Sequence, residues 1–187
     1  IIMSNFQNIL KIETKYIILE PIEYSDNKEI YLLRKNEERS VMSRPNTIKD
    51  QFKFYHSYLK RFEDKSEIYY KILNKSKNIY GYVRLTQINK RGVFNWESLI
   101  IKKDANPIIA LDTMITIYKI GFDYLGKEIL GPWPVPKGGD RIMKLHKHIG
   151  LGEIIYESND KNYMIIFKPH YDSRIKYLER KGFALII

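Results

Sequence analysis

The sequence predicts an α+β protein that forms one domain. Its 187 residues fall within the usual range of a single domain, and a hydrophobic content of 44% is enough to build a sizeable core. Between residues 67 and 101, three β-favouring runs alternate with short polar turns, whereas helical spacings of apolar residues precede and follow them. No internal repeat and no long linker divides the chain, so we expect one domain over residues 1–187.

The first part of the chain predicts one strand followed by two helices. A short apolar run at residues 16–19 favours a strand and breaks at Pro21. Residues 25–26 then offer an N-cap for a first helix, and Thr47 with Asp50 offers one for a second. The apolar positions with helical spacing are Ile30, Leu33 and Val41 in the first helix, and Phe52, Tyr55, Leu59 and Phe62 in the second.

The middle of the chain predicts an antiparallel meander followed by a long helix. Each of three successive runs is rich in β-branched and aromatic residues and ends at a polar turn, which is typical of hairpin-connected strands. Helical spacing returns from residue 108 to 125, with Pro107 suited to the first turn and Gly126 to the stop. The three strands are expected at residues 68–73, 79–88 and 93–101.

The C-terminal part predicts a further strand, a short helix, a hairpin and a last helix. Prolines interrupt the strand, so it should lie where its N–H groups are not needed by a neighbour. Gly150 closes the short helix, and Gly182 follows the last one. These elements are expected at residues 128–135 (strand), 140–149 (helix), 154–156 and 163–167 (hairpin), and 173–180 (helix).

The composition excludes several classes of protein. The chain has no cysteine, so it offers no disulfide, no thiolate chemistry and no Cys-based zinc site. Its first ten residues lack the pattern of a signal peptide, and no stretch approaches eighteen uninterrupted apolar residues. We therefore expect a protein without a membrane span that acts in the cytoplasm.

The charge of the chain favours an anionic partner. Lys and Arg number 32 against 22 Asp and Glu, a formal net charge of +10. A nucleic-acid binder is one interpretation of this excess, but no basic helix, RNP-like strand or Cys/His finger accompanies it. The positive residues are also scattered, as on an ordinary solvated surface. A phosphate-bearing small molecule therefore remains a candidate partner, and nucleic acid is not expected.

Four residue runs resemble motifs of the GNAT superfamily of N-acetyltransferases, in particular its branch that acts on nucleotide-linked amino sugars. The resemblance covers nearly the whole chain and depends on the order and spacing of the motifs. A second match to the helix motif, at residues 172–183, is rejected because it would leave no residues for the final hairpin. The four runs are Leu33-Arg34-Lys35-Asn36, the helix start at residues 47–52, Gly81-Tyr82-Val83, and residues 140–151, which resemble the helix motif N-x-R-A-x-x-L-Y-x-x-L-G-F.

The resemblance implies a GNAT fold, a mixed central sheet of about seven strands with helices on both faces. It also implies acetyl-CoA as the donor, and an acetyl group moved to the amine of a nucleotide-linked amino sugar in surface polysaccharide biosynthesis. A homodimer is one option for the assembly. In the family, a gap beside the fourth strand holds the pantetheine arm, and a glycine-rich turn at the next helix N-terminus binds the pyrophosphate.

The donor site that the resemblance implies lies at residues 96–109, together with one arginine of the helix motif. The matching turn has no glycine, and Pro107 removes one N–H donor. Three interpretations stay open: an altered pyrophosphate loop, a donor other than acetyl-CoA, or a non-catalytic GNAT-fold binding protein. The candidate cofactor-binding residues are Leu99, Ile100, Ile101, Lys103, Ala105, Asn106, Ile108 and Arg141.

The catalytic and acceptor candidates come from the same resemblance. His146 aligns with the tyrosine that protonates the departing thiolate, and an imidazolium could do the same. Glu97 is a candidate base for the amine, although a strand glutamate is more often a cross-strand charge partner. Gln51 stands where the branch has a histidine. The candidate substrate-binding residues are Arg34, Met42, Arg44, Gln51, Tyr55 and Trp133.

Overall fold

The computed structural model describes residues 6–36, 45–136, 146, 153–157 and 161–186. The eight strands of this part of the chain form one sheet in the order β1-β2-β3-β4-β5-β6-β8-β7. Only β5 and β6 pair in parallel, and the other neighbours are antiparallel. The expected mixed sheet of about seven strands is confirmed, and the additional strand is β1, which has two residues.

The elements follow one another along the chain in the predicted order. The N-terminal half contains β1 (Ile12–Glu13), β2 (Ile18–Pro21), the 3-10 turn η1 (Tyr24–Asp26), α2 (Asn27–Lys35), α3 (Ile48–Glu63), β3 (Glu67–Leu73) and β4 (Ile79–Thr86). The rest contains β5 (Val93–Ile101), α4 (Pro107–Lys119), the π-helical turn η2 (Ile120–Tyr124), β6 (Ile129–Pro136), β7 (Glu153–Glu157), β8 (Lys161–Phe167) and α6 (Lys168–Arg180).

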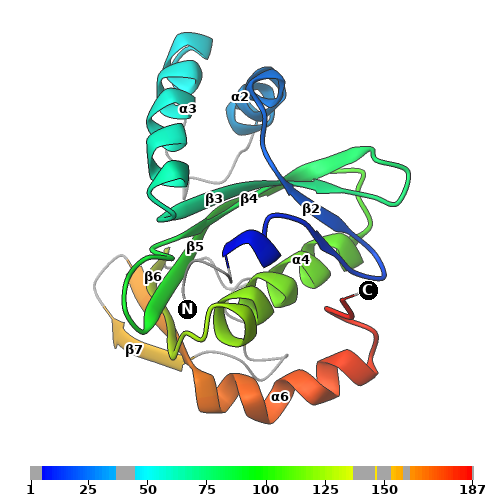
Figure 1. The fold of residues 1–187 in the computed structure, drawn as a ribbon, viewed down its shortest axis with the longest axis vertical. Coiled ribbons are helices and arrows are strands. Elements are labelled where there is room, and N and C mark those ends of the chain that lie inside the picture. Colours follow the sequence, from blue (N-terminus) through cyan, green and yellow to red (C-terminus); the bar gives the residue numbers. More distant parts are fainter. Residues whose placement is uncertain (1–5, 37–44, 137–145, 147–152, 158–160, 187) are drawn as a thin grey trace.

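Helices cover both faces of the sheet, as expected. Figure 1 shows α2 and α3 on one face, and α4 and α6 on the other. The strands alternate accordingly: on β3, Ile68 and Tyr70 belong to the main core under α4, whereas Tyr69 belongs to a smaller core under α2 and α3. Burial of both faces explains why the central strands are apolar almost throughout.

Two helix starts follow from local sequence chemistry. The backbone N–H of Asp50 donates to Thr47 Oγ1 over 3.2 Å, and the Thr47 N–H donates to Asp50 Oδ2 over 2.9 Å, so the predicted cap of α3 is confirmed. The last helix, in contrast, begins at Lys168 instead of the expected residue 173. Pro169 lies in its first turn, where a missing N–H has no cost, and the chain before it is extended.

Other helix and strand boundaries differ from the predicted ones by a few residues. The first predicted strand lies two residues later, at β2, and the second meander strand ends at Thr86. The long helix changes to a π-helical turn at Ile120 before the stop at Gly126. His146 is helical, but the rest of the helix predicted at 140–149, the turn at 158–160 and Val41 lie outside the described residues.

Candidate functional site

The sheet divides between β5 and β6. The two strands pair only at their first positions, Val93 with Ile129 and Phe94 with Leu130. Beyond this point the side chain of Asn95 reaches across, and its Nδ2 donates to the Pro132 carbonyl over 3.3 Å. The edge of β5 from Asn95 to Ile101 therefore forms no ladder with β6, which is the separation that the donor site requires.

A β-bulge lies on this open part of β5. Tyr82 faces Ile100 and Arg84 faces Glu97, so Val83 on β4 stands opposite two residues of β5. One of these two, Ser98, has a φ of 57°. Such a bulge re-aims the backbone and side chains next to the unpaired edge of the strand.

Gly81 keeps β4 and β5 close beyond the bulge. It pairs with Ile101, and a Cβ added to it would lie 2.0 Å from the carbonyl oxygen of Ile100. Only a glycine allows this approach. The Gly81-Tyr82-Val83 run therefore has a structural role in holding the bulged strand.

The N-terminus of α4 follows β5, but its donors are largely engaged. Asn106 is the N-cap, and its Oδ1 accepts a 3.0 Å hydrogen bond from the N–H of Ile108. Pro107 has no N–H, and the N–H of Ile109 donates to the Asn106 carbonyl. An incoming pyrophosphate must displace the Asn106 side chain before it can bind the N–H of Ile108.

The other donor candidates lie around this turn. Lys103 and Asn106 are exposed, and Ala105 and Ile108 are half-buried. Leu99 and Ile101 pack against the main core, whereas Ile100 is buried beside Tyr82. Lys102 Nζ lies 2.5 Å from Glu29 Oε1, so its charge is already paired. Arg141 lies outside the described residues.

His146 is buried in an aromatic cluster beside the separated strands. Its ring stacks on Tyr118 of α4 with centroids 6.0 Å apart, and the Trp133 ring lies 5.3 Å away. Trp96 completes the cluster, 6.4 Å from Trp133. Burial lowers the pKa of His146 to about 4, so the ring is neutral at neutral pH. A neutral ring does not supply the imidazolium acid that the resemblance implied, so the role of His146 in protonating the thiolate stays a prediction.

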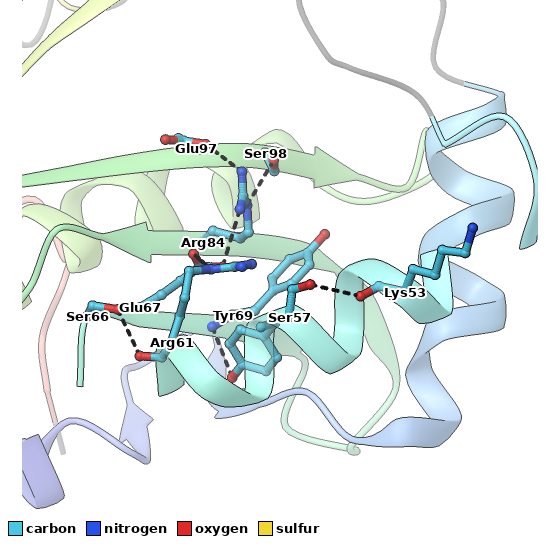
Figure 2. Close-up of polar contacts among 10 residues, drawn as sticks. Lys53, Ser57, Arg61, Ser66, Glu67, Tyr69, Arg84, Glu97 and Ser98 are labelled. Atoms are coloured by element: carbon cyan, nitrogen blue, oxygen red, sulfur yellow. Dashed lines mark hydrogen bonds and ion pairs between the residues drawn. The ribbon is translucent and has the colours of Figure 1, made fainter. Parts of the chain in front are cut away.

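Arg84 on β4 and four other polar side chains are connected on the α2/α3 face of the sheet, and we call these five residues the Arg84 network. Its Nη1 donates to Glu67 Oε1 over 3.2 Å, its Nη2 to Glu97 Oε2 over 2.5 Å, and its Nε to Ser98 Oγ over 3.2 Å. Arg61 Nε donates to the other oxygen of Glu67 over 2.7 Å. Figure 2 shows the Arg84 side chain between Glu67 on β3 and the pair Glu97 and Ser98 on β5.

Aromatic rings hold the two arginines of the network. The Phe54 ring lies 5.1 Å from the guanidinium carbons of both Arg61 and Arg84, and the Tyr69 ring lies 5.9 Å from that of Arg84. Tyr69 is fully buried, and its Oη has no hydrogen-bond partner among the described residues. Burial raises the pKa of its phenol. A ligand that reaches this face therefore meets fixed guanidinium groups.

Glu97 belongs to this network instead of standing free as a base. It faces Arg84 across β4 and β5, which is the cross-strand charge pair that a strand glutamate commonly forms. Its carboxylate is nevertheless half exposed, one residue before the bulge. A direct role in removing a proton from an amine requires that the carboxylate leave Arg84.

The acceptor candidates do not lie together. Arg34 is buried near Tyr69, Arg84 and Glu97, and burial lowers the pKa of its guanidinium. Gln51 and Tyr55 have structural roles: Gln51 Nε2 donates to Asn27 Oδ1 over 3.0 Å inside the protein, and Tyr55 packs between Tyr24 and Tyr58. Trp133 lies in the aromatic cluster at the strand separation, and Met42 and Arg44 lie outside the described residues.

Sequence reasoning missed Arg84, Glu67, Ser98 and Tyr69. The signal was present as charged residues within otherwise apolar strands. Given the meander register, Tyr69, Arg84 and Glu97 stand opposite one another on three adjacent strands, and alternation puts Glu67 on the same face. The bulge that places Ser98 beside Arg84 had no signal in the sequence.

Comparisons with known proteins agree with this architecture. No family model and no curated protein matches the chain. Among solved structures, apo FdhC, described as a nucleotide-linked sugar GNAT, superposes with a TM-score of 0.79 at 24% identity, covering 93% of this chain and 98% of that one. A spermidine N-acetyltransferase from Vibrio cholerae in complex with CoA and spermine gives 0.62 at 17% identity, covering 83% and 97%.

A third structure, a GCN5-related N-acetyltransferase from Brucella melitensis, gives a TM-score of 0.68 at 15% identity over 91% of this chain and 84% of that one. The chain therefore has the GNAT fold. The resemblance inferred from the motifs is confirmed at this level. The β7–β8 hairpin precedes α6, which agrees with rejecting the alternative motif at residues 172–183. In the described residues, no helix is long and apolar enough to cross a membrane.

Proposed function

We propose that this chain is a GNAT-type N-acetyltransferase that moves the acetyl group of acetyl-CoA to the amine of a nucleotide-linked amino sugar. The observation that carries the proposal is the separation of β5 from β6 after Phe94, next to the bulge at Ser98 and Leu99. An open strand edge presents backbone N–H and C=O groups that need partners, as the amides of a pantetheine arm do. The resemblance to the family places the pantetheine arm in a gap beside this strand, which agrees with the open edge.

The proposed reaction needs little covalent chemistry from the protein. The lone pair of the acceptor nitrogen attacks the thioester carbon, the new C–N bond forms, and the C–S bond breaks. The nitrogen loses one proton and the thiolate gains one. The backbone of β5 around Leu99 and Ile100 would hold the thioester and stabilise the developing oxyanion. His146 is neutral at neutral pH and cannot act as an imidazolium acid, so we assign it a packing role beside the donor.

Charge on the α2/α3 face favours an anionic acceptor. Arg34, Arg61 and Arg84 lie there, and the two carboxylates beside them, Glu67 and Glu97, are already paired with arginine. A polyamine would need unpaired acidic groups, whereas the two carboxylates beside these arginines are already paired. A sugar nucleotide carries phosphates that suit guanidinium groups. The role we propose is a step in surface polysaccharide biosynthesis, which uses such acceptors. We propose that this step takes place in the cytoplasm.

A second candidate is a GNAT-fold protein that binds without catalysis. The observation that favours it is the capped start of α4, where Asn106 occupies the N–H of Ile108 and Pro107 supplies none. Two measurements distinguish the enzyme from the binding protein: acetyl-CoA binding by calorimetry, and turnover. An enzyme binds acetyl-CoA and turns it over, whereas a non-catalytic binding protein releases no thiol with any acceptor.

The proposal is tested by following release of free thiol from acetyl-CoA in the presence of UDP- and dTDP-linked amino sugars. Spermidine serves as the cationic comparison, and a nucleotide sugar without an amine serves as the blank. We expect thiol release only with amino sugars, and a product heavier by one acetyl group. Turnover of spermidine alone would contradict the anionic acceptor. No turnover with any amine would leave the binding protein as the better description.

A further inference from the structure

We propose that Arg84 is an oxyanion-binding residue for the acceptor, and that the Glu97 carboxylate occupies this position until the acceptor displaces it. The assignment to the acceptor rests on the proposed acetyl transfer, whereas the anion site itself does not. Figure 2 shows the arrangement: Arg84 lies between a partner on β3 and a partner on β5. The two carboxylates that contact Arg84 differ in solvent exposure and in the number of their hydrogen-bond partners.

Glu67 is the permanent partner of Arg84. Its side chain is 5% exposed, and it accepts hydrogen bonds from both Arg84 and Arg61. Removing a buried carboxylate from two guanidinium groups leaves charges unpaired in a poorly solvated place, which is strongly unfavourable. Glu67 therefore anchors the Arg84 guanidinium at one side.

Glu97 is the exchangeable partner. Its side chain is 47% exposed, and Arg84 is the one hydrogen-bond partner that the described residues provide for it. Water solvates the half-exposed Glu97 carboxylate when it separates, and Arg84 keeps its ion pair with Glu67, so this separation costs less than the loss of Glu67. A phosphate or carboxylate oxygen of a ligand can thus replace the Glu97 oxygen at Nη2 at small cost.

The guanidinium stays in place when Glu97 leaves. Arg84 is only 13% exposed, its Nε donates to Ser98 Oγ, and the Phe54 and Tyr69 rings pack against it. Its planar guanidinium is therefore pre-organised to bind an oxyanion where it now binds the Glu97 carboxylate. A mobile lysine would lose more conformational entropy on binding.

The position of this site suits an acceptor. Ser98 belongs to the bulge of β5, so Arg84 touches the segment beside which the thioester is proposed to lie. An acceptor anchored there by an oxyanion lies next to the open strand edge. Displacement also frees the Glu97 carboxylate, one residue before the bulge, to accept the proton that the attacking amine loses. Binding of the acceptor would then create the base.

Binding of UDP and of CoA, measured separately by calorimetry, tests the proposal without any turnover. Glu97→Gln removes the competing carboxylate, and we expect UDP to bind about two- to fivefold more tightly. Glu20→Gln is the matched control, because Glu20 is a paired glutamate with the same charge on β2, which is not adjacent to β5. It should leave UDP binding unchanged. Equal effects of the two variants would mean that overall charge is responsible, and would overturn the proposal.

Arg84→Gln should weaken UDP binding about tenfold or more, because a charge-assisted hydrogen bond is lost. Arg84→Lys keeps the charge and supports the comparison if the glutamine variant unfolds. The CoA arm identifies the source of the oxyanion: an equal change in CoA affinity would assign Arg84 to the donor and overturn the acceptor site. If UDP binding follows the expected order but no thiol is released with any amino sugar, the proposed function fails while the anion site stands.

Discussion

The carboxylate of Asp112 on α4 accepts a 2.6 Å hydrogen bond from the backbone N–H of Ala184, near the other end of the chain. Its second oxygen accepts a 2.6 Å hydrogen bond from Thr14 Oγ1. All three residues are fully buried. One side chain thus joins α4 to the segments that precede β2 and follow α6, and these are the segments that Figure 1 shows beside α4.

We expect Asp112→Ala to lower the free energy of unfolding by about 2–5 kcal/mol, because two buried donors, Thr14 Oγ1 and the Ala184 N–H, lose their acceptor. Urea unfolding followed by circular dichroism measures the change. Asp104→Ala, at an exposed position before α4, is the control and should be nearly neutral. Equal stability of both variants would contradict the role of Asp112 as a buried tether.

Gly81→Ala should destabilise the protein, although alanine reduces the conformational entropy of the unfolded chain. The added Cβ would lie 2.0 Å from the Ile100 carbonyl oxygen, so β4 and β5 must move apart. Overpacking of this kind costs about 1–3 kcal/mol. The same displacement should raise the KM for acetyl-CoA, because it moves the bulged strand. The control is Gly92→Ala, where the left-handed φ of 71° is strained but no atom is close, so stability falls and the KM should not change.

Asn106→Gly tests whether the side-chain cap of α4 competes with the donor. Glycine is a fair N-cap, so the loss of stability should be only a few tenths of a kcal/mol, about what Asn→Gly costs at such a position. The Ile108 N–H becomes available, and we expect the Kd of acetyl-CoA to fall by about two- to tenfold, the range of one hydrogen bond. Thr47→Gly removes the corresponding cap of α3 and should leave the Kd unchanged. Weaker acetyl-CoA binding by the Asn106 variant would show that the amide is itself a ligand.

His146 should make the protein less stable in mild acid. Its pKa is about 4 in the folded protein and 6.5 when exposed, so between these values the unfolded chain binds the extra proton. The free energy of unfolding therefore falls as the pH drops from 6.5 towards 4, by up to about 3 kcal/mol, since one pKa unit corresponds to 1.36 kcal/mol. Unfolding curves at several pH values for His146→Phe should lack this slope.

His56→Gln is the control for that experiment, since His56 is exposed on α3 and its loss should preserve the slope. Turnover provides a second comparison. If neutral His146 only packs beside the donor, His146→Phe should retain most of the acetyl transfer. A loss of several orders of magnitude in kcat at unchanged KM would instead identify His146 as a catalytic residue in its neutral form.

The best-predicted parts of the fold are those with local signals. The cap of α3 at Thr47, the turn between β3 and β4, and the span of β5 from Val93 to Ile101 all follow from residues close together in the sequence. The start of α6 was missed although a local signal was present, because Pro169 is a good first-turn residue and precedes the expected start at residue 173.

The candidate site was predicted less well. The strand expected at the donor site has its predicted bounds, and Arg34 and Glu97 do lie near each other. Arg84 and Glu67 were missed, although they connect the two sides of the network. Gln51 was assigned from its motif position, yet its amide is buried against Asn27. A motif position specifies where a residue lies along a helix, and packing decides whether its side chain reaches a ligand.

The sequence by itself determined the order of strands and helices, the GNAT resemblance and the residues that make the helix caps, because propensity, periodicity and capping act between near neighbours in the chain. Only the tertiary structure decided three features: the separation of β5 from β6 after Phe94, the bulge at Ser98, and the burial that lowers the pKa of His146. Strand register, solvent exposure and the local field each depend on contacts between segments that lie far apart in sequence and meet only in the folded chain.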